Sequence, residues 1–325
     1  MPAGTVVTVS NPKVTVVVFT YNHEPFIAQA LESVLAQETS FSFDIVVLED
    51  CSTDATREIV LEYERKWPTR IHALLSPVNK CDNQAFVHVV EIAQSPYIAV
   101  LDGDDYWTST QKLQKQANFL DAHQDCTVCF HNVQIVYEDQ SQPPRLGNPP
   151  DQKRFSTIED ILEGCFINGC SPMFRRGVFG KFPEWYDHDV TADWALHILN
   201  ALHGNIGYLD EVMGVYRKHK GGFWSGLSTV QQRERLIQFY RDMNRRLNYT
   251  HQRQIRSLLA RQWYDLALTY EQQGELQSAR QCLRHSIDEA PFSTRVHWTE
   301  LLEAWRRLHA TEGTAPSMTG DCAQS

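Results

Sequence analysis

Residues 97–107 read YIAVLDGDDYW, an apolar run that ends in three carboxylates within four positions. The apolar residues predict a buried strand, and Gly103 permits a tight turn directly after it. The three carboxylates repel one another unless a cation compensates their charge. An Asp-x-Asp pair supplies the oxygen ligands that Mg²⁺ and Mn²⁺ prefer. The alternative is a solvated acidic turn before a helix, and the motif alone does not decide between the two.

Short β-branched runs alternate with helical patterns on both sides of this stretch. Helices are expected after Pro25, after a cap at Ser52 or Asp54, over 83–94 and over 108–122. This rhythm predicts an α/β fold, a Rossmann-like and mostly parallel sheet flanked by helices. The expected strands are 14–19, 45–49, 71–75, 97–101 and 127–137.

Composition narrows the function classes. The 325 residues carry a formal net charge of -10, which argues against nucleic acid as a partner because phosphate binding needs a basic footprint. No apolar run approaches the roughly 20 residues that span a bilayer, and residues 1–12 lack the pattern of a secretory signal. The eight cysteines are scattered. They predict reduced, mostly buried thiols and a cytoplasmic protein.

Polar clusters follow three of the expected strands. In an open parallel sheet, ligands bind beyond the carboxyl ends of the strands, so these clusters are expected to share one site. Asp54 is expected to cap its helix instead. The clusters are Thr20-Tyr21-Asn22, Glu49-Asp50-Cys51-Ser52-Thr53-Asp54 and the carboxylates that begin at Asp102.

Taken together, the TYN run, the Glu49–Asp54 cluster and DGDDYWTSTQKLQKQ over 102–116 resemble the nucleotide-binding half of family 2 glycosyltransferases with the GT-A fold. The resemblance covers residues 14 to about 225. It implies Asp104 as the principal ligand of Mn²⁺ or Mg²⁺, and Asp102 at the ribose or in the metal shell. It also implies nucleotide or donor contacts by Thr20, Tyr21, Asn22, Glu49, Asp50 and Gly103.

The second half must supply a base, because inversion in one displacement requires deprotonation of the acceptor hydroxyl. The family carries this base in a Glu-Asp pair that opens a helix. The matching segment here has Ala192 and Asp193, so Asp193 is the expected base, although it could instead cap its helix. Asp187 and Asp189 are competing carboxylates.

Residues 216–222 read YRKHKGG and resemble the mobile basic loop of the family. Arg217 is expected to pair with the diphosphate through two hydrogen bonds, and His219 to bind the metal or a phosphate. Trp107, Trp185 and Trp194 are candidates for stacking on sugars, although core packing is the commoner fate of tryptophan.

The expected activity is the inverting transfer of a sugar from a nucleotide-diphosphate donor, with a lean towards a UDP-sugar, to a hydroxyl of a glycan, lipid-linked or protein acceptor. Many relatives build cell-surface polysaccharides, and peripheral association with the inner membrane face would suit that role. Two alternatives stay open. One is a sugar nucleotidyltransferase, which usually has a glycine-rich basic loop absent here. The other is an inactive GT-A domain that binds a partner.

The C-terminal third changes in character and becomes helical. Its spacing follows one 34-residue tetratricopeptide unit, which would need neighbouring helices to bury its face. A simple amphipathic hairpin predicts nearly the same structure, but only the repeat implies a surface for a protein partner. The expected organisation is a GT-A domain at 1–228, a helical extension at 229–310 and a disordered tail at 311–325. The residues that carry the repeat spacing are Trp263, Leu266, Ala267, Tyr270, Gly274, Ala279, Leu283, Ser286 and Pro291.

Overall fold

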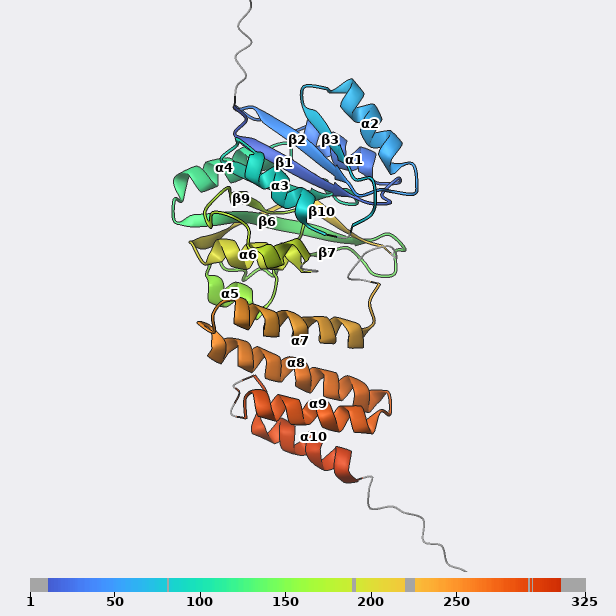
Figure 1. The fold of residues 1–325 in the computed structure, drawn as a ribbon, viewed down its shortest axis with the longest axis vertical. Coiled ribbons are helices and arrows are strands. Elements are labelled where there is room, and N and C mark those ends of the chain that lie inside the picture. The colour runs from blue at the N-terminus through green and yellow to red at the C-terminus, as the bar shows by residue number, and fades with distance from the viewer. Residues whose placement is uncertain are drawn as a thin grey trace, which may run out of the picture. The chain divides into compact units, whose positions relative to one another are not determined.

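The computed structural model describes residues 11–80, 82–188, 191–219, 226–291, 293 and 295–310. They fall into two compact units, which meet in the sequence between His219 and Lys220. The first unit is an α/β domain and the second is helical (Figure 1).

The first unit is built on a single mixed sheet. Its strands lie in the order β3-β2-β1-β4-β9-β6-β10-β5, with β7 paired to β6 and β8 paired to β10. The strands are β1 (Val14–Thr20), β2 (Phe43–Glu49), β3 (Ile71–Leu75), β4 (Tyr97–Asp102), β5 (Tyr106–Trp107), β6 (Cys126–Tyr137), β7 (Arg145–Leu146), β8 (Phe155–Ser156), β9 (Met173–Arg175) and β10 (Asn205–Lys218).

Helices cover both faces of this sheet. The order β3-β2-β1-β4 reverses direction after β3, so right-handed crossovers place α3 on the face opposite α1 and α2. The main apolar core agrees, because it draws on α1, α2 and α4 and not on α3. The helices are α1 (Ile27–Leu35), α2 (Thr56–Lys66), α3 (Gln84–Ile92), α4 (Lys112–Ala122), α5 (Ile158–Glu163), the 3-10 helix η1 (Glu184–His188) and α6 (Ala192–Ala201).

The expected α/β class with a mostly parallel sheet is confirmed, with two differences in detail. The strand β9 lies between β4 and β6 and is antiparallel to both. Its three residues are too few to show a period of two in the sequence. Helix α4 begins at Lys112 rather than at 108, because Tyr106 and Trp107 pair with Val215 and Gly214 of β10.

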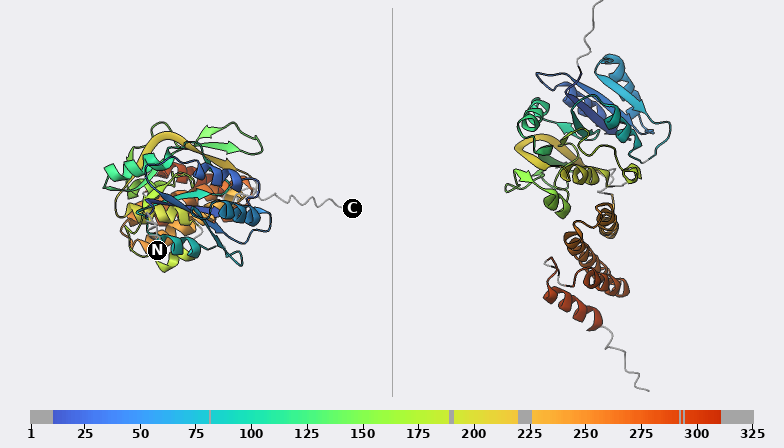
Figure 2. Two further views of the ribbon diagram at one scale, coloured as in Figure 1. Left: turned by 90° about the horizontal axis from the view of Figure 1, so that it is seen from above. Right: turned by 60° about the vertical axis from the view of Figure 1, so that its left-hand side comes forward.

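The second unit contains α7 (Thr229–Arg246), α8 (Gln252–Gln272), α9 (Leu276–Glu289) and α10 (Trp298–Ala310). Figure 1 shows these helices packed one after another in chain order, and Figure 2 shows the same array from two other sides. Gly274 has a φ of +79° between α8 and α9, a backbone conformation that glycine adopts without strain. Buried small residues, Ala267 and Ala279 among them, let the two helices approach. A helical hairpin therefore exists here, whereas its membership of the tetratricopeptide class stays a prediction.

Candidate active site

The candidate site lies where the strand order reverses. Strands β1 and β4 are parallel neighbours. From β1 the chain continues to β2 and β3 on one side of β1, and it then crosses back to form β4 on the other side. Such a switch point leaves a crevice beyond the carboxyl ends of the strands. The backbone N–H of Gly103 donates to the Phe19 carbonyl at 2.7 Å and joins the two loops. A Cβ at residue 103 would lie 2.9 Å from that carbonyl and 3.0 Å from His23 Nδ1, so only glycine fits.

Asp104 faces two histidines at this edge. Its Oδ2 lies 2.9 Å from His219 Nε2 and 3.8 Å from His23 Nε2. Burial lowers the pKa of His23, and the neighbouring His219 lowers it further while Asp104 acts against them. A neutral imidazole and a carboxylate are both metal ligands. Among the described residues, however, no three His, Cys, Asp or Glu side chains are arranged as a complete metal site.

Asp105 points inward and holds the end of β10. It is fully buried, and its Oδ1 accepts a hydrogen bond from the Arg217 backbone N–H at 2.8 Å. Burial raises the pKa of Asp105 well above its usual range, and the charges of Asp104 and Asp102 raise it further. Asp105 therefore links the acidic turn to the end of β10 from its buried side.

The Arg217 side chain braces the same turn. Its Nη1 donates to the Asp104 carbonyl at 2.5 Å, Nη2 donates to Gln29, and Nε lies 3.2 Å from a Glu138 carboxylate oxygen. The guanidinium also lies 4.5 Å from the centre of the Tyr106 ring. All three of its nitrogens thus contact protein groups, and the pairing of Arg217 with a diphosphate stays a prediction.

Asp102 and Asp193 come together from distant parts of the chain. Burial raises the pKa of Asp102 to about 8, and the charges of Asp104 and then Asp193 add to the shift. Asp193 lies in the first turn of α6, where its Oδ1 accepts a hydrogen bond from the Trp194 N–H at 2.7 Å. Thr191, not Asp193, occupies the N-cap position of this helix. Gly169 leaves room for Asp102, since a Cβ there would lie 2.4 Å from Asp102 Oδ2.

The loops after β1 and β2 are tied to each other. Asn22 has a φ of +53°, and its Oδ1 accepts hydrogen bonds from the Thr53 N–H at 2.8 Å and the Thr53 hydroxyl at 3.2 Å. Asp54 accepts from the Thr56 N–H at the start of α2 and from the Glu24 N–H, although Ala55, not Asp54, occupies the N-cap position of that helix. These hydrogen bonds fix the rim of the crevice.

Glu49 also lies within this brace rather than in the open crevice. Its buried carboxylate accepts from the Ser52 N–H at 2.6 Å and pairs with Arg57 at 2.5 Å. Asp50 accepts from the Lys80 N–H at 3.2 Å. Thr20 is buried, whereas Tyr21 is 40% exposed at the rim.

The other sequence candidates divide between core and surface. Trp107 and Trp194 are buried, and their indole N–H groups donate to the carbonyls of Cys170 and Ile161, so both pack in the core. Trp185 lies half-buried in η1. Asp187 is also in η1, while Asp189 and the expected loop glycines 221 and 222 lie outside the described residues.

Sequence reasoning missed His23 as part of the site. His23 directly follows the TYN run that marked the strand end, so its position was a usable signal. Gly169 lies in the run 168–175, which resembles the family stretch near the sugar pocket, but only the fold shows that it lies against Asp102.

A family model described as glycosyl transferase family 2 matches residues 15–182, just over half of the chain. The chain belongs to glycosyl transferase family 2. The match includes the loops after β1, β2 and β4, whereas Asp193, Arg217 and His219 lie beyond it.

This family 2 chain has relatives in several bacteria. It is 35% identical over 222 residues to an uncharacterized protein of Mycobacterium tuberculosis, which is 67% of this chain and 62% of that relative. The match thus spans less than two thirds of the mycobacterial protein. It is 31% identical over 185 residues to the putative teichuronic acid biosynthesis glycosyltransferase TuaG of Bacillus subtilis, which covers 56% of this chain and 71% of TuaG.

Solved structures support the fold of this family 2 chain. TarS residues 1–349 of Staphylococcus aureus, in complex with UDP-GlcNAc, align with a TM-score of 0.64 and 19% identity over 92% of this chain and 91% of that one. The mannosyltransferase PcManGT of Pyrobaculum calidifontis, in complex with GDP-Man and Mn²⁺, aligns with a TM-score of 0.53 and 17% identity over 93% and 88%. At these identities the likeness establishes a GT-A-like fold.

Proposed function

We propose that this chain is an inverting, metal-dependent transferase that moves a sugar from a nucleoside-diphosphate donor to an acceptor hydroxyl. One observation carries the proposal. Asp102 at the end of β4 and Asp104 just after it lie at the switch point, where the charge of Asp193 in α6 acts on Asp102 and His219, just after β10, contacts Asp104. Family 2 membership supports sugar transfer over the nucleotidyltransferase alternative.

The residues present fit a divalent cation that also binds the donor. Asp104 and His219 approach each other at 2.9 Å and would supply one oxygen and one nitrogen ligand. Mg²⁺ and Mn²⁺ at nucleotide sites are commonly held by one or two protein groups together with phosphate oxygens and water. The incomplete protein shell is therefore what such a site requires, and the mixed ligands favour Mn²⁺. When bound, the cation would offset the negative charge of the diphosphate.

Asp193 is the proposed base. It takes the proton of the acceptor hydroxyl while that oxygen attacks the anomeric carbon, and the nucleoside diphosphate leaves from the opposite face with the electrons of the broken C–O bond. The first turn of a helix favours the negative charge that this carboxylate needs before the reaction. Ala192 replaces the Glu of the family pair, which changes the acceptor side and leaves Asp193 in place.

Arg217 and Asp105 act as positioning residues in this scheme. Together they hold the peptide of Asp104 and the end of β10, so His219 stays close to Asp104. Precise placement of this kind matters because a displacement of about 1 Å can reduce rates by roughly 10²-fold. Contact between Arg217 and a diphosphate would require Arg217 to leave Gln29 or Glu138.

The loops after β1 and β2 form the proposed nucleoside wall. Tyr21 is the exposed aromatic at this rim and is suited to stack on a base. Thr20, Asn22, Glu49 and Asp50 shape the wall behind it. Because TarS binds UDP-GlcNAc and PcManGT binds GDP-Man, the donor class is a nucleotide sugar, and we favour a UDP-sugar.

The proposed acceptor is a cell-surface glycan, free or lipid-linked. TuaG and TarS, whose names refer to teichuronic acid and poly(ribitol-phosphate), support this class. None of the helices within the described ranges is long and apolar enough to cross a bilayer. We propose peripheral contact with a membrane if the acceptor is lipid-linked, and a protein-binding role for the helices of 229–310.

Ala192 favours one rival, an inactive domain that binds donor without turnover. Incubation of the full chain with UDP-GlcNAc, UDP-Glc and UDP-Gal plus Mn²⁺, with water and a panel of glycans as acceptors, separates the two. Release of UDP together with a product of inverted anomeric configuration supports the transferase. Tight binding of UDP, together with no release of UDP from any of the three donors across the acceptor panel, would support the inactive domain.

A further inference from the structure

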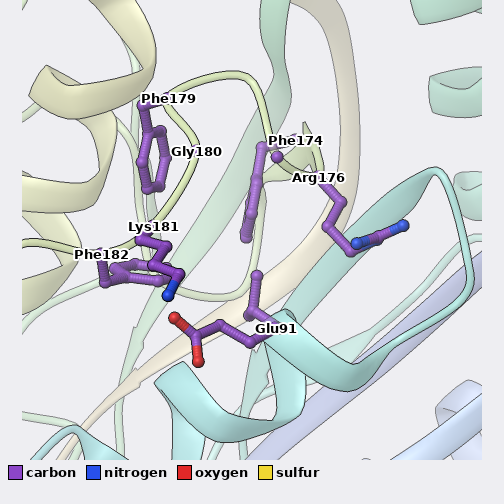
Figure 3. A pocket seen from close by; sticks show the side chains of 9 residues that line it. Glu91, Phe174, Arg176, Phe179, Gly180, Lys181 and Phe182 are labelled. Carbon is purple, nitrogen blue, oxygen red and sulfur yellow. The ribbon is translucent and has the colours of Figure 1, made fainter.

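A second hollow lies between the C-terminal end of α3 and the turn that follows β9. It is a cavity of about 250 Å³, lined by Phe174, Phe179, Phe182, Glu91, Arg176 and Lys181 (Figure 3). The proposed reaction uses none of these residues.

This cavity is remote from the catalytic carboxylates. The Arg176 N–H donates to the Pro96 carbonyl at 2.9 Å, which places the turn beside the first residue of β4. Asp102 is the last of the six residues of β4. At about 3.3 Å per residue, roughly 20 Å of strand separates the two sites. The cavity therefore lies at the opposite edge of the sheet.

Phenylalanine rings form the walls. Phe174 is buried, and Phe179 and Phe182 are each partly exposed. The rings of Phe179 and Phe182 stand 5.0 Å apart at 83° and so face in different directions. Phe182 packs on Tyr186 with ring centroids 4.8 Å apart. The angle between the Phe179 and Phe182 rings is therefore supported from behind by Tyr186, and apolar ring faces stay available to a ligand.

The rim carries charges of both signs. Figure 3 shows the Glu91 carboxylate and the Lys181 ammonium facing each other beside the Phe182 ring. Both of these side chains are exposed, whereas Arg176 is partly buried and its Nε donates to the Ser95 carbonyl at 2.9 Å. The rim thus offers hydrogen-bond donors and an acceptor around an apolar floor.

These features select among ligand classes. The volume is slightly below the roughly 300–1,000 Å³ of pockets for drug-sized ligands, so a nucleotide would not be enclosed. Glu91 disfavours a multiply charged anion, and Arg176 with Lys181 disfavours a cation. A wholly apolar group would desolvate the charged rim without pairing it. A sugar ring has an apolar C–H face for the phenylalanines and hydroxyls that both donate and accept.

We propose that this cavity binds one ring of a neutral carbohydrate chain, at a subsite that holds an acceptor glycan away from its reacting end. The role as an acceptor subsite rests on the proposed function, whereas carbohydrate binding itself does not. A tether about 20 Å from the catalytic edge keeps the growing end close to the donor and raises its effective concentration.

Binding of chitotriose and of mannotriose to the full chain, without donor or metal, tests this subsite by saturation-transfer NMR titration. Phe179→Ala should weaken binding about tenfold through lost stacking. Lys181→Met, at an exposed position that does not endanger folding, should weaken it about fivefold through a lost hydrogen bond. Phe155→Ala is the matched control, because Phe155 is 40% exposed on β8 and lies beneath Arg154 outside the cavity.

Failure of the wild-type chain to bind either oligosaccharide would overturn the proposal, as would binding that both cavity variants leave unchanged. Donor turnover is measured in a separate assay, so the two proposals can fail independently. A chain that transfers sugar but binds neither oligosaccharide contradicts the subsite alone. A chain that binds them through Phe179 without any turnover supports carbohydrate binding in the cavity and contradicts both the transferase and the acceptor role.

Discussion

Two polar regions meet at the switch point, and they differ in how far the protein itself supplies hydrogen-bond partners and compensating charges for their side chains. In the loops after β1 and β2, Asn22, Glu49 and Asp54 accept hydrogen bonds from neighbouring backbone groups. At the acidic turn after β4, the half-buried Asp102 and the buried Asp105 lie beside other carboxylates, and their pKa values are raised. The first region is largely satisfied within the protein, although the buried Thr20 hydroxyl and His23 Nδ1 have no hydrogen-bond partner among the described residues. The second carries electrostatic cost, which is the pattern expected where function sets the arrangement.

The largest effect should come from Asp193→Asn. The asparagine amide preserves the shape of the side chain but cannot take the proton of the acceptor hydroxyl. We therefore expect kcat to fall by roughly 10²–10⁴-fold with little change in the KM for the donor. Steady-state kinetics with saturating donor measure this. Thermal unfolding of the variant should match the wild type, and unchanged kcat would remove Asp193 from the reaction.

Gly169→Ala should come next. Its new Cβ would lie 2.4 Å from Asp102 Oδ2 and force that carboxylate to move, which should lower kcat/KM about 10²-fold. Gly164→Ala is the control, because nothing lies within 4 Å of a Cβ at that position. Equal activity of the two variants would show that the placement of Asp102 is unimportant.

The buried Lys112 beneath the turn gives a pH effect. Its ammonium lies 3.8 Å from the centre of the Trp107 ring, and burial lowers the pKa of Lys112 to about 7. Between pH 7 and about 10 the unfolded chain binds this proton and the folded chain does not. The unfolding free energy should therefore rise with pH, by up to about 1.4 kcal/mol per unit.

Denaturant titrations of the wild type and Lys112→Met from pH 6.5 to 9.5 test this effect. In Lys112→Met, the unfolding free energy should lack this rise with pH, and this variant should be more stable than the wild type near pH 7. Parallel stability curves for the two proteins would contradict the assignment.

Asp54→Ala should have the smallest effect. It removes the carboxylate that accepts from the Thr56 and Glu24 N–H groups, and loss of such an acceptor at the start of a helix costs about 1 kcal/mol of stability. Turnover per folded molecule should not change. Burial raises the pKa of Asp54, but the hydrogen bonds from the Thr56 hydroxyl and from the Thr56 and Glu24 N–H groups outweigh it and lower the pKa. The difference from wild type should therefore shrink as the pH falls from about 4 through this lowered pKa. A large loss of kcat would mean that the braced region does more than support the rim.

The sequence was sufficient for the parallel half of the sheet, because each strand from 14 to 101 has its own apolar run and its own helix. It did not predict β9, whose position depends on contacts with β4 and β6. Ser52 or Asp54 was predicted as the cap of α2, whereas Ala55 occupies the N-cap position and Asp54 accepts a hydrogen bond from Thr56 beside it. The brace formed by Arg217 could not be predicted, since it joins segments more than 90 residues apart. That Asp102 and Asp193 belong to one site was implied by the family resemblance alone, and their mutual electrostatic influence depends on the fold.

The proposed transferase function depends most on the binding of a cation by Asp104, because that cation in turn binds the donor diphosphate. Calorimetric titration of UDP into the full chain, with and without Mn²⁺, measures this directly, with Asp104→Asn as the comparison. We predict that Mn²⁺ tightens UDP binding at least about tenfold in the wild type and has no effect in Asp104→Asn. Equal enhancement by Mn²⁺ in both proteins would contradict the account.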